Sequence, residues 1–587
     1  MKQFLKFVLA TITGIFILFA IFFLVILSLA GGMSKDKKAV IDSNSVLVVS
    51  LNYPMPERTN SSPFEAFAAG LSGDMTRPIG MYDVIQSIEH AKTDDKISGI
   101  FLDLTFVDAG YARLSEIRNA LEDFKSSGKF IYAYGELYYN QTYYLASVAD
   151  SVFLNPKGNM LFNGMAAEVT FLKETLAKLG IEMQVIKHGK FKGAVEPFTR
   201  DELSEANRHQ INEYINSLFS QYVSTVGKSR NLTPDELKAM ADSLSVTNPK
   251  QALAGKMVDE LAYRDQVISH IKSRMGLGED DDINYVKLAK YFAAGGVRSE
   301  DSHDSKIAVV YADGDIVSGN GEANEVGSDR FLKALRAARE DDDVKAVVLR
   351  VNSPGGSALA SEVIWREAIL TKAKKPLIVS MGDVAASGGY YISCMADTIV
   401  AMPNTITGSI GVFGMYPNAS GLYDKLGLKT DYVKTSEYAD FGRIDRPLNA
   451  GEMAMLTQFV EEIYTDFVGH VSEGRELTTQ FIDSVAQGRV WTGEMAKENG
   501  LVDVHGGLND AIKIAAFKAG IDSYDLQSYP NVKDPFAEFF ESFGMASIKQ
   551  KVIKQELGEN YSIYQRLKKL QSMTGVQAVM PFSIGVN

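Results

Sequence analysis

Residues 346–357 read AVVLRVNSPGGS, a run of mainly β-branched residues that passes directly into a turn of small residues. A short apolar run bounded by Pro and Gly is typical of a strand buried inside a sheet. Residues 377–390, LIVSMGDVAASGGY, repeat this arrangement of strand and glycine-rich turn. Because helix-like segments separate such strands, the sequence predicts an α/β fold with parallel sheets and right-handed crossovers.

The same pattern is present earlier in the chain. Further strands are predicted at 46–51, 99–104, 130–134 and 307–311. Between the first two of them, Val84, Ile85, Ile88 and Ala91 have the spacing of one helix face. In sheets of this class, functional groups gather at the carboxyl ends of the strands, so the turns after residues 351 and 381 are the first candidates for a site.

The two halves of the chain are copies of one another. A shift of 247 positions aligns them without a gap over about a hundred residues. The triplet KLG at 178–180 falls on KLG at 425–427, and YY at 143–144 falls on YY at 390–391. This period is far longer than that of a solenoid repeat, so we predict two tandem domains from an internal duplication.

The N-terminus predicts a membrane anchor. Residues 7–30 contain no charged residue, and about 20 apolar residues span a bilayer as a helix. The run is too long for the apolar part of a cleaved signal peptide. Lysines flank it on both sides, so charge does not decide its orientation. The predicted segments are a tip (1–6), a transmembrane anchor (7–30), a linker (31–44), two repeats (45–300 and 305–530) and an unassigned tail (531–587).

The amino-acid composition limits which partners and cofactors are expected. The net charge of −13 argues against a nucleic-acid surface, which needs clustered Lys and Arg. The single cysteine, Cys394, cannot form an intrachain disulfide. One cysteine and seven scattered histidines offer no ligand cluster, so no metal and no cofactor are predicted.

Two turns of the second half have the residues of an acyl-transfer site. Ser387 follows the strand at 377–381, and Gly356 and Gly388 lie at strand-to-helix transitions. Unpaired N–H groups at a helix start point toward incoming negative charge, so these two glycines could hold an oxyanion. The alternative is that the glycines only form turns and that Ser387 only caps a helix.

Comparison of the repeats favours a composite site. Asn140 stands in the first half where Ser387 stands in the second, whereas Lys192 has Ala439 as its counterpart. A serine hydroxyl needs an adjacent base, and no histidine lies in a recognisable catalytic motif. Lys192 lies in GKFKGAVEPF, where burial could keep its amine neutral. The alternative is an ordinary exposed lysine.

Four segments together resemble the long, duplicated form of the signal peptide peptidase A (protease IV) family. They are RVNSPGGS at 350–357, GDVAASGGY at 382–390, TGSIG at 407–411 and FKGAVEPF at 191–198. The resemblance runs from the apolar N-terminus to about Tyr529. It implies two tandem ClpP/crotonase-like domains, the first supplying the lysine and the second the serine.

The resemblance also implies the roles of individual residues. Ser387 would be the nucleophile, Lys192 the general base, and Ser409 a hydrogen-bonding partner that orients the lysine. Amides near Gly356 and Gly388 would hold the oxyanion. The family implies a homotetramer in the bacterial inner membrane, single-pass, with catalytic domains that face the periplasm and cut hydrophobic remnant signal peptides.

Two other functions fit the same fold. A crotonase-like acyl-CoA enzyme uses a similar oxyanion hole, but a bilayer anchor and a Ser–Lys pair argue against it. An inactive membrane scaffold could keep the fold, but it would not need the serine, the lysine and the glycine loop. The sequence leaves open whether Lys192 meets Ser387 of its own chain or of a neighbouring chain.

Overall fold

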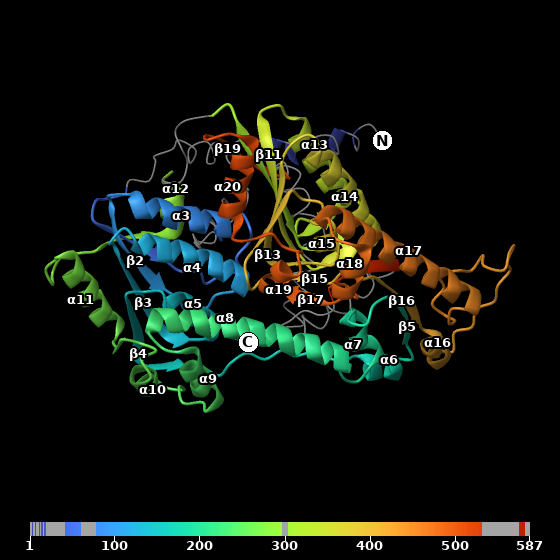
Figure 1. Cartoon of the computed structure of the whole chain (residues 1–587), viewed down its shortest axis with the longest axis horizontal. Coiled ribbons are helices and arrows are strands. Elements are labelled where there is room, and N and C mark those ends of the chain that lie inside the picture. Colours follow the sequence, from blue (N-terminus) through green and yellow to red (C-terminus); the bar gives the residue numbers. More distant parts are fainter. Residues whose placement is uncertain are drawn as a thin grey trace.

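The computed structural model describes residues 41–59, 78–295, 303–530 and 575–580, together with a few positions between 3 and 18. Figure 1 shows the first half, in blue and green, beside the second half, in yellow and orange. Among the described residues, no helix is long and apolar enough to cross a membrane. Most of the predicted anchor at 7–30 lies outside them.

The first half forms a six-stranded sheet in the order β6-β4-β3-β2-β1-β7. All of its neighbouring strands are parallel. In chain order its strands are β1 (Ser45–Val49), β2 (Ile97–Asp103), β3 (Phe130–Tyr138), β4 (Ser151–Met160), β6 (Glu260–Leu261) and β7 (Asn284–Lys287). The predicted parallel α/β class is confirmed for this half.

The second half builds a sheet with the corresponding strand order, β17-β15-β13-β11-β8-β19, and β14 and β18 extend it from β13. Its strands are β8 (Lys306–Asp313), β11 (Val344–Ser353), β13 (Leu377–Ala386), β14 (Thr398–Ala401), β15 (Ile406–Gly408), β17 (Val490–Thr492), β18 (Val504–His505) and β19 (Asp525–Tyr529). Its neighbouring strands are parallel, apart from β15 and β17.

The helices also repeat. Helices α3 (Met81–Thr93), α4 (Tyr111–Lys125) and α6 (Lys173–Leu179) correspond, at the same offset of 247, to α13 (Ser328–Glu340), α14 (Ala358–Lys372) and α16 (Ser420–Leu426). The long helices α8 (Glu205–Arg230) and α17 (Ala450–Arg475) are a further matching pair. Other helices of the described segments from residue 41 onward are α5 (Asn140–Ala146), α7 (Glu196–Thr199), α9 (Pro234–Asp242), α10 (Pro249–Ala254), α11 (Arg264–Met275), α12 (Leu288–Ala293), α15 (Gly388–Tyr391), α18 (Thr479–Val485), α19 (Gly493–Glu498) and α20 (Leu508–Ala519).

A third sheet joins the two halves. Its order is β10-β9-β12-β20-β16-β5. These strands are β5 (Glu182–Lys187), β9 (Asp315–Val317), β10 (Glu325–Gly327), β12 (Gly355–Ser357), β16 (Phe413–Asn418) and β20 (Gly575–Val579). Strand β5 of the first half pairs antiparallel with β16 of the second. The segment that corresponds to β5 by the repeat, 429–434, is not a strand, so the duplication is no longer symmetric here.

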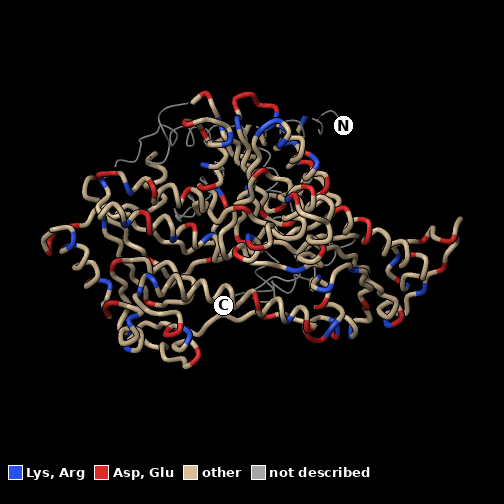
Figure 2. Tube along the Cα trace, in the orientation of Figure 1, with Lys and Arg blue, Asp and Glu red and all other residues tan. Residues whose placement is uncertain are grey.

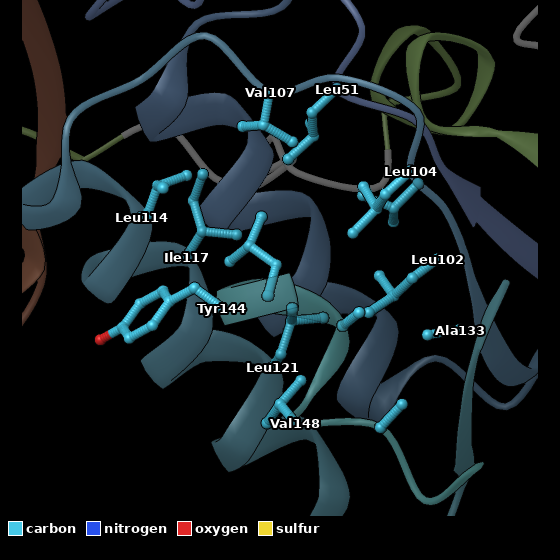
Figure 3. Packing of buried hydrophobic residues seen from close by; sticks show 14 of the residues in the cluster. Leu51, Leu102, Leu104, Val107, Leu114, Ile117, Leu121, Ala133, Tyr144 and Val148 are labelled. Atoms are coloured by element: carbon cyan, nitrogen blue, oxygen red, sulfur yellow. The ribbon is translucent and has the colours of Figure 1, made fainter. Parts of the chain in front are cut away.

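The core of the first half packs helices α3 and α4 against the sheet. Val84, Ile85, Ile88 and Ala91, the predicted inner face of α3, are all buried. Figure 3 shows side chains of α4, including Leu114, directed toward those of the strands and loops beneath. Burying such side chains stabilises the fold by about 1.5–3 kcal/mol each, so these helices are fixed on the sheet.

Buried ion pairs connect the two halves of the chain. Acidic and basic residues are interspersed along the coloured trace in Figure 2, and exposed pairs of this kind contribute little. Arg350 on β11 is different, because it is fully buried and lies 2.8 Å from both Glu57 and Glu116. Both carboxylates belong to the first half. Next to them, Arg113 of α4 forms an ion pair with Asp383 of β13.

We expect Arg350→Met to lower the free energy of unfolding by about 3–5 kcal/mol, because it leaves two carboxylates buried without their partner. Urea unfolding followed by circular dichroism would measure this loss. Lys92→Met, which removes the exposed pair with Asp123, is the control and should change stability by less than about 1 kcal/mol. Equal effects of the two substitutions would contradict a structural role for the buried ion pairs.

Candidate active site

Ser387 lies where the strand β13 ends and the short helix α15 begins. Its backbone has φ 55° and ψ −114°, a conformation that non-glycine residues rarely adopt. Such a residue costs about 1–3 kcal/mol and persists only where its surroundings enforce it. Here its N–H donates to the carbonyl of Gly408 on the adjacent strand β15, at 2.8 Å. The turn therefore holds the Ser387 hydroxyl in a fixed, fully buried position.

Lys192 approaches this hydroxyl from the first half. It lies after β5, immediately before the short 3₁₀ turn Gly193–Val195. Its Nζ is 2.7 Å from Ser387 Oγ, 3.0 Å from Ser409 Oγ and 3.1 Å from the carbonyl oxygen of Ser409. The structure thus brings the three predicted residues Ser387, Lys192 and Ser409 together within one chain.

The Lys192 amine is in a medium that disfavours charge. The side chain is fully buried, and its hydrogen-bond partners, the Ser387 hydroxyl and the hydroxyl and carbonyl of Ser409, carry no charge. Burial lowers the pKa of Lys192 well below its ordinary value of 10.5. A neutral amine near neutral pH can accept the proton of the serine hydroxyl, which an ordinary lysine cannot.

A glycine-containing loop of the second half packs against Lys192. Gly488 has φ +78°, and a Cβ there would lie only 2.7 Å from Lys192 Cβ. The carbonyl of the neighbouring Gln487 accepts a hydrogen bond from the Phe191 N–H at 2.8 Å. From the other side, Gln210 of α8 donates to the Phe191 carbonyl at 2.9 Å. The position of Lys192 therefore depends on residues from both halves, which sequence spacing did not reveal.

Ser409 follows strand β15 and also has a positive φ, 51°. Its N–H donates to the carbonyl of Arg489 at 2.7 Å. Pairing of β15 with β13 on one side and with β17 on the other fixes this end of the strand. Ser409 presents both its hydroxyl and its carbonyl to the lysine, so two acceptors set the direction of the amine.

The two predicted oxyanion donors are neighbours. A Cβ on Gly388 would lie 3.1 Å from the Gly356 nitrogen and 2.7 Å from Ser361 Oγ. A Cβ on Gly356 would lie 1.9 Å from the carbonyl oxygen of Ile316. Neither position can hold a side chain without moving its surroundings. As the first residue of α15, Gly388 also has an N–H with no acceptor inside the helix.

Comparisons with known proteins identify the family of this chain. The model of peptidase family S49 matches residues 123–278 and 369–522. Protease 4 of Salmonella typhi is 38% identical over 477 residues, which is 79% of this chain and 76% of that protein. The chain belongs to peptidase family S49. The chloroplastic serine protease SPPA of Arabidopsis thaliana is 30% identical over 550 residues, 92% of this chain and 78% of that protein.

The predicted enzyme class, a serine peptidase, is confirmed for this S49 member. Among solved structures, a ClpP1 mutant from Listeria monocytogenes has 16% identity and a TM-score of 0.24. The match covers 35% of this chain and 94% of that chain. A likeness this weak adds nothing to the assignment.

One part of this S49 site was missed from sequence. The tail 531–587 had no assignment, yet its strand β20 pairs with β12 and β16. Strand β12 begins at Gly355 and carries Gly356, one of the predicted oxyanion donors. The signal was present in GVQAVM at 575–580, a short run that ends at a proline and suits a strand. Because this run is far along the chain from the other motifs, the sequence does not show which strands it pairs with.

The lowered pKa of Lys192 has a consequence for stability. Below pH 10.5 the unfolded chain protonates this lysine, whereas the folded chain keeps it neutral down to its lowered pKa, so protonation favours unfolding across that window. We expect Lys192→Met to raise the melting temperature at pH 7, and we expect this gain to shrink as the pH approaches 10.5. Thermal melts between pH 7 and pH 10.5 would measure it.

The exposed neighbour Lys190 supplies the matched control. Lys190→Met should show no gain that depends on pH in this way. A Lys192→Met protein that is less stable than the parent by the same amount at every pH would contradict a neutral buried amine.

Proposed function

We propose that this serine peptidase uses Ser387 as its nucleophile and Lys192 as its general base, and that it degrades remnant signal peptides at a membrane. The observation that carries the proposal is the 2.7 Å contact between a fully buried lysine amine and a serine hydroxyl. Neither an acyl-CoA enzyme nor an inactive scaffold needs this contact.

The reaction is an acyl transfer. Neutral Lys192 takes the proton of Ser387 as Oγ attacks the carbonyl carbon of a peptide bond. The amides of Gly356 and Gly388 stabilise the negative oxygen of the tetrahedral intermediate, where the loss of one such donor typically costs about 3–4 kcal/mol. Lys192 then gives its proton to the leaving amine. Water attacks the remaining ester and regenerates the hydroxyl, again with Lys192 as the base.

The strands beside the serine favour an extended substrate, because β12 and β16 both pair with an extended segment, β20, in this structure. A peptide that runs between β12 and β16 would pair with backbone groups of both strands, which gives affinity without a fixed sequence. Val195, Phe413 and Met415 form a buried apolar cluster at this place. Apolar surroundings of this kind suit the hydrophobic segments of signal peptides.

The anchoring and assembly belong to the same proposal. The uncharged run 7–30 supports a single-pass helix in the bacterial inner membrane, with the catalytic domains on the periplasmic side. The sequence resemblance supports two ClpP/crotonase-like domains per chain and a homotetramer. Each chain would contribute a complete Ser–Lys pair, because both residues lie within reach of one another in a single chain.

Ser387→Ala and Lys192→Ala should each lower kcat for a leucine-rich fluorogenic peptide by about 10⁴- to 10⁶-fold, because each removes one half of a unit that acts together. Stopped or continuous fluorescence assays would measure this. Lys190→Ala, two residues from the base, is the control and should keep normal activity. Activity near the parent level in either of the first two variants would rule out the assigned roles.

Ser409→Ala should have a smaller effect. It removes one hydrogen bond to the lysine but leaves the Ser409 carbonyl in place. A loss of about 1–3 kcal/mol corresponds to a kcat lower by roughly 5- to 150-fold, with little change in KM. Steady-state kinetics would separate the two constants. A rise in KM alone would indicate that Ser409 binds substrate instead of orienting the base.

A further inference from the structure

Tyr464 of the long helix α17 contacts two segments that meet at Lys192. Its hydroxyl accepts a hydrogen bond from the Gln487 side chain at 3.1 Å and a longer one from the Gln487 N–H at 3.4 Å. Its ring stacks on His188, four residues before Lys192, with the ring centroids 3.7 Å apart. The Tyr464 side chain is buried. One residue of the second half therefore joins the loop that packs against the lysine to the segment that carries the lysine.

Gln487 needs support from its surroundings. Its φ of 55° is one that non-glycine residues rarely adopt, and such a conformation persists only where neighbouring groups enforce it. Asp483 of α18 supplies a second support, because its carboxylate accepts hydrogen bonds from the Tyr464 hydroxyl at 2.5 Å and from the Gln487 side chain at 2.6 Å. Tyr464, Asp483 and Gln487 thus form a closed triangle of hydrogen bonds.

The loop held by this triangle forms part of the surroundings of Lys192. The Gln487 carbonyl accepts a hydrogen bond from the Phe191 N–H at 2.8 Å, and a Cβ on Gly189 would lie 2.5 Å from the same oxygen. At the next position of the loop, a Cβ on Gly488 would lie 2.7 Å from Lys192 Cβ. The loop and the lysine segment are therefore in close contact on both sides of Phe191, and a shift of Gln487 would open this contact to water.

The charged groups that face Tyr464 belong to three segments. Asp483 lies on α18, Glu461 lies three residues before Tyr464 on α17, and His188 follows β5. Glu461 lies 2.8 Å from His188 Nδ1, but its side chain is half exposed, so this pair contributes little. The hydrogen bond from the Tyr464 hydroxyl to the Asp483 carboxylate is charge-assisted and therefore the stronger contact.

We propose that Tyr464, together with Asp483, is a positioning residue for the general base, which holds the loop at 487–488 against Lys192 and keeps the amine directed at Ser387. This inference rests on the proposed function of Ser387 and Lys192. Tyr464 acts through the loop, without a bond to the reacting atoms. Because burial lowers the pKa of Lys192, a loosened loop should let this pKa rise toward 10.5.

Tyr464→Phe tests the proposal, because it removes the hydroxyl and keeps the ring that stacks on His188. The kcat for a leucine-rich peptide should fall by about 10- to 100-fold, with KM changed by less than about twofold. The pH midpoint at which a serine-directed phosphonate labels Ser387 should move upward, because the lysine then loses its proton at a higher pH. Steady-state kinetics and labelling over a pH series would measure the two effects.

Tyr143→Phe is the matched control. It removes a buried hydroxyl that donates to the Met257 carbonyl at 2.5 Å in the core of the first half. It should lower the melting temperature without changing kcat or the labelling midpoint. Asp483→Ala should reproduce the effect of Tyr464→Phe on both, and the double variant should lose little more kcat than either single variant, because both act through Gln487.

Each outcome decides between the inference and its alternatives. Tyr464→Phe with the parental kcat and midpoint, beside an inactive Lys192→Ala protein, would overturn this inference and leave the proposed function standing. An equal loss of kcat in Tyr143→Phe would also overturn it, because the loss would then follow stability alone. A rise in KM alone would place Tyr464 in substrate binding and would overturn it as well. An active Lys192→Ala protein would instead disprove the proposed function and this inference with it.

Discussion

The ability of Lys192 to accept a proton from Ser387 depends on burial of its amine more than on any other property of the fold. An exposed lysine would be protonated at neutral pH and could not accept a proton. Removing the amine from water costs free energy, and the fold supplies it through the packing of two domains around one side chain. The first half contributes the amine, and the second contributes the hydroxyl, the acceptors of Ser409 and the Gly488 loop that closes over it.

This dependence explains why the two halves are joined so firmly. Strand β5, which precedes Lys192, enters the third sheet by pairing with β16 of the second half. The buried Arg350 takes both of its carboxylate partners from the first half. Asp383, four residues before the serine, is held by Arg113 of α4. A small rotation between the halves would disturb these ion pairs and the Ser–Lys contact together, so the same arrangement of the halves maintains both.

Much of this could be predicted from sequence, because local patterns encode it. The buried strands, the face of α3 and the offset of 247 between the repeats follow from apolar spacing and self-similarity. The absence of Ser387 from one copy and of Lys192 from the other singles out these two residues, whereas the role of Ser409 follows only from the family resemblance. What the sequence did not reveal is long-range pairing. Contacts between segments hundreds of residues apart produce the pairing of strand β20, the packing of Gly488 against Lys192 and the ion pairs of Arg350. No local pattern specifies such contacts.

The central claim is that a neutral lysine activates the serine. The pH dependence of the rate at which a serine-directed phosphonate or fluorosulfonyl reagent labels Ser387 tests it most directly, because labelling needs the activated hydroxyl but no peptide substrate. The rate should rise with pH to a plateau, with a midpoint well below 10.5, and the Lys192→Met protein should not be labelled at a comparable rate. A midpoint near 10.5, or equal labelling of the two proteins, would contradict the account.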